Sequence, residues 1–148
     1  MKSEKIIIGR RERASFPDIH AENIEVKVDT GAYTSSIHVT ESEVVEHNNR
    51  QQLKVLFFDN SHPAYTGQYV FFDTFRYKKV KSSTGQEQMR YFVKLRINLA
   101  GKLWTTDFSL TKRNGMKYPI LLGRKLLNKR FIVDPSKVDL TSKLKLAE

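Results

Sequence analysis

One short segment combines residue types that suit chemistry: Asp29-Thr30-Gly31, which ends the alternating apolar run of residues 24–28. A carboxylate held at the end of a strand can take a proton as a general base. The same residues also suit an ordinary turn, because an aspartate side chain accepts a hydrogen bond from the backbone two residues on. The tripeptide alone leaves both interpretations open.

A second segment, residues 120–123, has three branched apolar residues followed by glycine. Such a run is typical of a strand buried on both faces. Gly123 permits a close backbone approach where the chain turns into a short helix, expected over residues 124–129. Between the two segments, residues 78–92 are predicted to form a polar hairpin, with a turn of small residues and arms rich in lysine and aromatic side chains.

Short strands account for most of the remaining sequence. The clearest alternation of apolar and polar residues runs over residues 91–99, and frequent turn residues separate it from other apolar runs. We therefore predict a single all-β domain, a sandwich or barrel, over residues 1–148. The tail from about residue 135 has weak strand character, and we expect it to be loosely held.

Composition excludes several kinds of site. The chain has no cysteine, which removes disulfides, thiolate zinc sites and cysteine nucleophiles. It has no phosphate-binding glycine loop, and its four histidines fit no recognised zinc motif, so we expect neither a metal nor a cofactor. The N-terminal residues have only a short apolar run, from which we expect no signal peptide, no membrane partner and a cytoplasmic location.

The net charge of +10 is unevenly distributed along the chain. Residues 1–75 carry 8 Lys and Arg against 11 Asp and Glu, whereas residues 76–148 carry 18 against 5. A solubility bias would produce such an excess, and so would a surface that attracts an anionic partner. Composition does not choose among nucleic acid, an anionic membrane and an acidic peptide.

The segment Asp29-Thr30-Gly31 and the run at residues 120–123 together resemble the paired elements of the aspartic peptidase fold. The hairpin between them stands where retropepsins have the flap that closes over bound peptide. The resemblance implies an all-β, retropepsin-like closed barrel with a flap hairpin and one short C-terminal helix. It also implies two carboxylates that share one proton. Because the chain has one Asp-Thr-Gly, the second carboxylate is expected from another copy, in a weak homodimer.

A narrower resemblance covers most of the chain. The bacterial retropepsin-like family commonly labelled "ATP-dependent zinc protease" has similar successive blocks, which lie here at residues 6–19, 26–38, 80–90, 104–127 and 131–135. The sequence supports the peptidase part of that label and not its zinc or ATP. The family is also associated with ligases that append glutamates to the C-terminus of a ribosomal protein, which implies a peptidase that trims acidic tails.

The resemblance assigns catalysis to Asp29, which activates water, while Thr30 and Gly31 hold its loop. The residues expected to bind substrate are Ala32, Lys81, Arg90, Arg113 and Arg124. A neighbouring histidine, His38, is expected to be a hydrogen-bonded structural residue.

One position departs from the retroviral pattern. Retroviral enzymes usually have an acidic residue after Asp-Thr-Gly-Ala that pairs with the arginine of their Gly-Arg motif, but this chain has Tyr33 there. Arg124 therefore either pairs with another carboxylate of the fold or binds a substrate carboxylate. Arg90 and Arg113 face the same alternatives.

We interpret the chain as an aspartic endopeptidase that acts on acidic peptides, and two other classes stay open. A peptidase-fold module would capture acidic tails without cutting them. A nucleic-acid-binding β-barrel would use the same basic surface, with salt-dependent affinity and with bases stacked on exposed aromatics such as Tyr69, Phe71 or Tyr91. That class ranks last, because it gives neither motif a purpose, and we expect no nucleic-acid partner.

Overall fold

The computed structural model describes residues 4–81, 84–112, 117–142 and 144 of the chain. Strands dominate it, as the alternating sequence pattern predicts. In chain order the elements are β1 (Ile6–Phe16), the 3-10 helix η1 (Pro17–Ile19), β2 (Ala21–Val28), β3 (Ser35–His47), β4 (Arg50–Phe57), β5 (Val70–Phe72), β6 (Arg76–Lys81), β7 (Glu87–Leu99), β8 (Lys102–Thr111), β9 (Ile120–Leu122), α1 (Arg124–Leu127) and β10 (Phe131–Val138).

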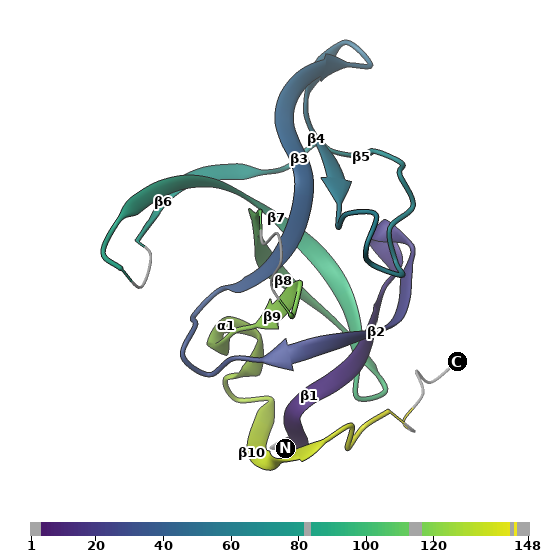
Figure 1. The fold of residues 1–148 in the computed structure, drawn as a ribbon, viewed down its shortest axis with the longest axis vertical. Coiled ribbons are helices and arrows are strands. Elements are labelled where there is room, and N and C mark those ends of the chain that lie inside the picture. The colour runs from purple at the N-terminus through teal and green to yellow at the C-terminus, as the bar shows by residue number, and fades with distance from the viewer. Residues whose placement is uncertain (1–3, 82–83, 113–116, 143, 145–148) are drawn as a thin grey trace.

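The central strands close into a barrel. Strands β1, β2, β9, β3, β8 and β7 pair in that order, and a bridge between Ser15 and Asn98 joins β7 back to β1. Closure leaves none of these strands as an exposed edge. The predicted all-β closed barrel is therefore confirmed (Figure 1).

The core fills the inside of this barrel with every second residue of its strands. On β7, Val93, Leu95 and Ile97 are buried, whereas the alternate residues Lys94 and Arg96 are exposed. Since side chains of a strand alternate between its two faces, the even-numbered residues of β7 lie on the outer surface of the barrel. The period of two in residues 91–99 thus correctly predicts which face is buried.

Strand β9 lies between β2 and β3, although those two strands are consecutive in the chain apart from a short loop. It runs parallel to β2, with Leu122 opposite Val28, and antiparallel to β3, with Ile120 opposite Ile37. The loop of residues 29–34 must therefore pass over the end of β9. This topology brings the two sequence motifs together.

A hairpin of β6 and β7 extends beyond the barrel and curves away from it, as Figure 1 shows. Its register places Lys78 opposite Arg90 and Arg76 opposite Phe92. The hairpin corresponds to the predicted flap, whose turn residues 82–83 lie outside the described residues. It projects on the side of the barrel where the loop of residues 29–34 lies.

The C-terminal segment is more firmly held than the sequence suggested. Strand β10 runs through residue 135 to Val138 and pairs with β1, so the expectation of a loose tail is wrong for these residues, whereas residues 143 and 145–148 lie outside the described residues. Beyond it, the fully buried carboxylate of Glu12 accepts hydrogen bonds from the backbone N–H groups of Leu140 and Thr141. These hydrogen bonds hold residues 140 and 141 in place, because a buried carboxylate without partners would carry a large desolvation cost.

The single predicted helix is present but shorter than expected, since α1 ends at Leu127 and not at Lys129. Lys129 has a φ of 70°, a left-handed conformation that does not continue a helix. Within the described ranges, no helix has the length and hydropathy that crossing a membrane requires.

Candidate active site

The loop that carries Asp29 is held by its own backbone and by β9. The Asp29 N–H donates to the carbonyl of Leu122 at 2.9 Å, and the Gly31 N–H donates to Oδ1 of Asp29 at 3.0 Å. A side chain at Gly31 would be crowded, because its Cβ would lie 3.3 Å from that same oxygen. The carboxylate of Asp29, half-buried, is thereby fixed in orientation at the end of β2.

The far side of the loop is attached to the start of α1. The backbone N–H groups of Arg124 and Lys125 donate to the carbonyls of Ala32 and Tyr33, at 2.9 and 2.8 Å. A Cβ at Gly123 would lie 2.6 Å from the Tyr33 carbonyl oxygen, so only glycine fits without displacement of the loop. The two motifs found in the sequence therefore form one hydrogen-bonded unit.

Among the described residues, Arg124 pairs with no carboxylate, and the alternative that it binds a substrate carboxylate stays a prediction. Its guanidinium donates to the backbone carbonyl of Thr30 at 2.9 Å and lies over the ring of Tyr33, with Cζ 5.8 Å from the ring centroid. A backbone carbonyl and an aromatic face thus stand where retroviral enzymes have an acidic partner. We conclude that Arg124 supports the Asp29 loop, and it does not line the neighbouring cleft.

A cleft of about 720 Å³ separates the Asp29 loop from the flap. The described residues that line it come from the loop, the flap and the outer surface of the barrel: Gly31, Ala32, Tyr33, Thr34, Ser36, Lys78, Lys79, Val80, Lys81, Arg90, Phe92, Ser109 and Leu121. Three of the five residues predicted to bind substrate, Ala32, Lys81 and Arg90, are among them. Of the other two, Arg124 does not line the cleft, and Arg113 lies outside the described residues.

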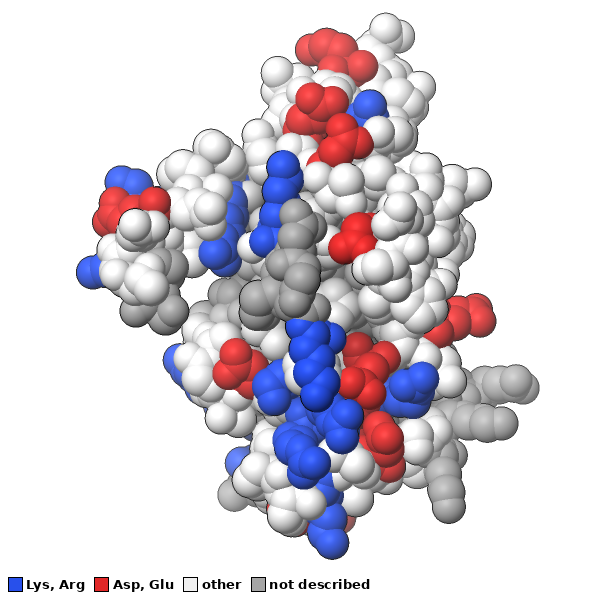
Figure 2. All heavy atoms as spheres, in the orientation of Figure 1, with Lys and Arg blue, Asp and Glu red and all other residues white. Residues whose placement is uncertain are grey.

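The lining of the cleft is basic on its flap side. Lys78 lies over the ring of Phe92, with Nζ 4.7 Å from the centroid, and Arg90 donates to the side chain of Gln88 at 3.0 Å. No Asp or Glu is among the lining residues that the structure describes. Figure 2 shows basic side chains on the side of the flap that faces the barrel, whereas acidic side chains gather at the far end of β3 and β4.

A further lysine near Asp29 was missed by the sequence reasoning. Because Val26 and Val28 point into the core, Lys27 lies on the outer face of β2, two residues before Asp29. Its Nζ is 5.1 Å from the centroid of the Tyr118 ring, and Nζ of Lys117 is 5.5 Å from the same centroid. Strand alternation was the signal that would have found it.

Comparisons with known proteins agree with this geometry. Residues 7–143 match the family profile described as "RimB-like: Retropepsin-like aspartic endopeptidase RimB". The chain belongs to the RimB-like family. The predicted resemblance to bacterial retropepsin-like peptidases is therefore confirmed at the level of family and fold.

The relatives of this RimB-like chain differ in length and in name. A "Probable alpha-L-glutamate ligase" of Shewanella pealeana is 31% identical over 140 residues, which are 92% of this chain and 30% of that protein. A protein with the same description from Desulfotalea psychrophila is 29% identical over 136 residues, which are 28% of its length. The chain thus spans about 30% of the length of the curated relatives that it matches.

A solved structure has the same fold. The Legionella pneumophila protein Lpg0085, described as of unknown function, superposes with a TM-score of 0.71 at 28% identity. The match covers 93% of the RimB-like chain and 99% of the Legionella protein. The fold therefore occurs in another protein over nearly the same extent of chain.

His38 is a buried residue of the RimB-like chain, as expected of a structural histidine. Its Nε2 lies 2.9 Å from Oδ2 of Asp59. Hydrogen bonds from the hydroxyl and backbone N–H of Ser61, and then from His38, hold the pKa of Asp59 below its usual range. The pair fixes the chain after β4 against the start of β3, on the side of the barrel away from the flap residues.

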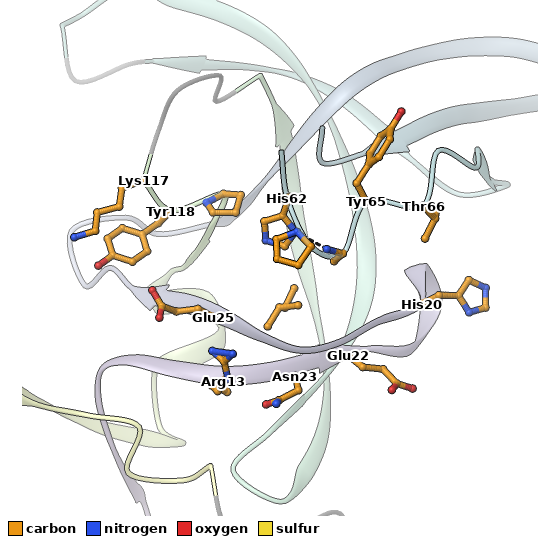
Figure 3. Close-up of a pocket in the computed structure, with 14 residues that line it drawn as sticks. Arg13, His20, Glu22, Asn23, Glu25, His62, Tyr65, Thr66, Lys117 and Tyr118 are labelled. Atoms are coloured by element: carbon orange, nitrogen blue, oxygen red, sulfur yellow. Dashed lines mark hydrogen bonds between the residues drawn. The ribbon is translucent and has the colours of Figure 1, made fainter. Parts of the chain in front are cut away.

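A second hollow, of about 490 Å³, lies between the β1–β2 hairpin and residues 62–66 and 117–119 (Figure 3). Its charged residues have both signs, with Arg13 and Lys117 opposed by Glu22 and Glu25. None of the predicted catalytic residues lines it. Among the described residues, no three His, Asp or Glu side chains are grouped as a metal site.

The aromatic residues suggested as stacking platforms for nucleic acid are used within the chain. The hydroxyl of Tyr69 donates to Glu41, and the ring of Phe71 stacks on His47 with centroids 3.8 Å apart. Tyr91 packs against Tyr77 and Phe75. These contacts do not favour the nucleic-acid interpretation.

Proposed function

We propose that this RimB-like chain is an aspartic endopeptidase that hydrolyses peptide bonds in acidic, glutamate-rich polypeptide tails. One observation carries the proposal: the Asp29 loop borders a cleft whose opposite wall is formed by the basic flap residues Lys78, Lys81 and Arg90. The carboxylate supplies the chemistry, and the basic wall supplies the preference for an acidic substrate.

In the proposed reaction, Asp29 and the Asp29 of a second copy share one proton. The ionised carboxylate takes a proton from water as the water oxygen attacks the scissile carbonyl carbon, while the protonated carboxyl donates a hydrogen bond to the carbonyl oxygen. The tetrahedral intermediate then collapses as a proton passes to the departing amine. The hydrogen bond from Gly31 to Asp29 keeps the carboxylate oriented throughout.

We propose that the second copy binds weakly. In this chain β10 pairs with its own β1, and the segment that follows is held by Glu12 of the same chain. Those contacts engage the terminal strand that retroviral enzymes use between subunits. Two protomers of net charge +10 also repel one another.

The preference for acidic substrate rests on electrostatics and on the relatives. A cleft lined by one sign of charge concentrates ligands of the opposite sign and speeds their capture. The curated relatives, named as probable alpha-L-glutamate ligases, contain a segment similar to this chain within a longer protein. A ligase that adds glutamate and a peptidase that removes it would act on the same kind of tail.

A second candidate is a module that binds acidic tails without cutting them. The hydrogen bond from the Gly31 N–H to Asp29 favours it, since an ordinary aspartate turn contains the same bond. Incubation of the purified protein with a glutamate-rich peptide, followed by mass spectrometry, separates the candidates. New peptide termini are expected from the peptidase; tight binding without new termini would establish the binding module in its place.

A further inference from the structure

A cluster of three cations surrounds one buried carboxylate beyond the cleft. Asp107 on β8 is 2% exposed, and its Oδ2 accepts from Arg76 of β6 at 3.1 Å and from Lys125 of α1. Its Oδ1 lies 3.3 Å from Nζ of Lys94 on β7. We call these four residues the cation ledge; none of them takes part in the proposed chemistry.

The cation ledge has an excess of positive charge. Burial by itself would raise the pKa of Asp107, but hydrogen bonds and charge from Lys125 and Lys94 lower it below its usual range, so the carboxylate is ionised at neutral pH. One negative charge then faces three positive ones. The cationic side chains remain open to solvent, with 50% of Arg76 and 66% of Lys94 exposed.

The ledge continues the surface of the cleft. Phe92 and Ser109, which line the cleft, are opposite one another on β7 and β8, and the next pair on the same face is Lys94 with Asp107. Two residues along a strand span about 7 Å. An extended peptide advances about 3.3 Å per residue, so a substrate residue two or three positions beyond the cleft would reach the ledge.

We propose that the cation ledge is a second binding site, which holds acidic residues of the substrate tail that lie outside the cleft. The proposal rests on the acidic substrate of the proposed function. Asp107 fixes the three cations in place before the ligand arrives, which lowers the entropy lost on binding. The ledge thereby makes long acidic tails better ligands than short ones.

The test measures peptide binding and not turnover, so its result does not depend on whether the chain cleaves peptides. In the Asp29→Asn protein, fluorescence anisotropy would compare glutamate peptides of about six and about twelve residues, lengths of about 20 and 40 Å when extended. The variant combines Lys94→Gln with Lys125→Gln. The matched control is Lys102→Gln, an exposed lysine about 16 Å from Lys94 along the β7–β8 pair.

We expect the double variant to bind the long peptide about fivefold more weakly and the short peptide less than twofold more weakly, with the control within twofold for both. Melting temperatures would show that the variant is folded. Equal losses of affinity for both peptide lengths, or no loss of affinity for the long peptide, would overturn the proposal of a second binding site. So would equal dependence on these lysines for a single-stranded RNA of matched charge, which would indicate a general polyanion surface.

The proposed function fails in a different way. Suppose that the wild-type protein cuts no acidic peptide, but replacement of Lys94 and Lys125 still weakens binding of the long peptide. The second binding site is then supported and the peptidase function is contradicted. If the protein cuts acidic peptides but the loss of affinity in the double variant does not depend on peptide length, the peptidase function is supported and the second binding site is contradicted.

Discussion

The guanidinium of Arg124 donates to the backbone carbonyl of Thr30, the residue that follows the proposed catalytic carboxylate. The bond joins the start of α1 to the Asp29 loop, of which residues 31–34 line the cleft although Arg124 does not. We therefore expect Arg124 to act as a positioning residue, whose replacement affects activity more than stability.

Arg124→Met keeps the apolar stem but removes the donor and the charge. We expect cleavage to fall about tenfold or more and the free energy of unfolding to fall by about 1–2 kcal/mol. Arg130→Met is the matched control, because Arg130 likewise donates to a backbone carbonyl, that of Leu126, and lies over an aromatic ring, that of Trp104. Similar losses of activity in the two variants would contradict the positioning role.

Gly123→Ala should unfold the protein more easily, because the new Cβ would lie 2.6 Å from the carbonyl oxygen of Tyr33. We expect a loss of about 2–4 kcal/mol in the free energy of unfolding, measured with denaturant. In Gly85→Ala nothing lies within 4 Å of the Cβ and only the φ of 86° opposes the change, so a loss of about 1 kcal/mol is expected. Equal losses would show that the contact at Gly123 is unimportant.

Replacement of Lys78, Lys79 and Lys81 by glutamine should slow the capture of an acidic peptide and leave a neutral peptide almost unaffected. Exposed charges act mainly on association, over a distance of about 8 Å at physiological ionic strength. Rates of cleavage measured at several salt concentrations would check this, since the variant should also have a flatter salt dependence. Equal slowing of both peptides would mean that the flap charges are structural.

The sequence predicts part of the site, because some of the constraints on its residues are local to the backbone. Asp29 and Gly123 stand at strand ends where backbone geometry restricts the residue type, and the fold bears out their juxtaposition. Strand alternation also predicts that Lys27, two residues before Asp29, lies on the outer face of its strand, although we did not use it. Patterns of period two are reliable here because one face of each barrel strand is buried.

Other features could not be predicted, because they depend on contacts between distant elements. The three cations that contact Asp107 come from three separate elements, and no spacing of residues in the sequence predicts that they lie together. Glu12 is similar: its partners Leu140 and Thr141 are more than a hundred residues away. These hydrogen bonds explain why residues 140 and 141 are held despite the polar sequence around them.

The assembly of two protomers can be tested by mixing. Specific activity should rise with enzyme concentration, because a weak dimer dissociates on dilution. At concentrations where dimers form, a ninefold excess of Asp29→Asn should suppress wild-type activity by about tenfold, since about nine in ten wild-type protomers would pair with the variant. Activity that is proportional to concentration and indifferent to the variant would indicate a monomer that works alone.

The central claim is that the carboxylate of Asp29 activates water, and Asp29→Asn tests it most directly. The amide has nearly the same shape, accepts the same hydrogen bond from Gly31 and cannot act as a base. Mass spectrometry of a glutamate-rich peptide after incubation would count new termini, with circular dichroism as the check on folding. The account predicts cleavage by the wild-type protein and none by the folded variant; undiminished cleavage by Asp29→Asn would contradict it.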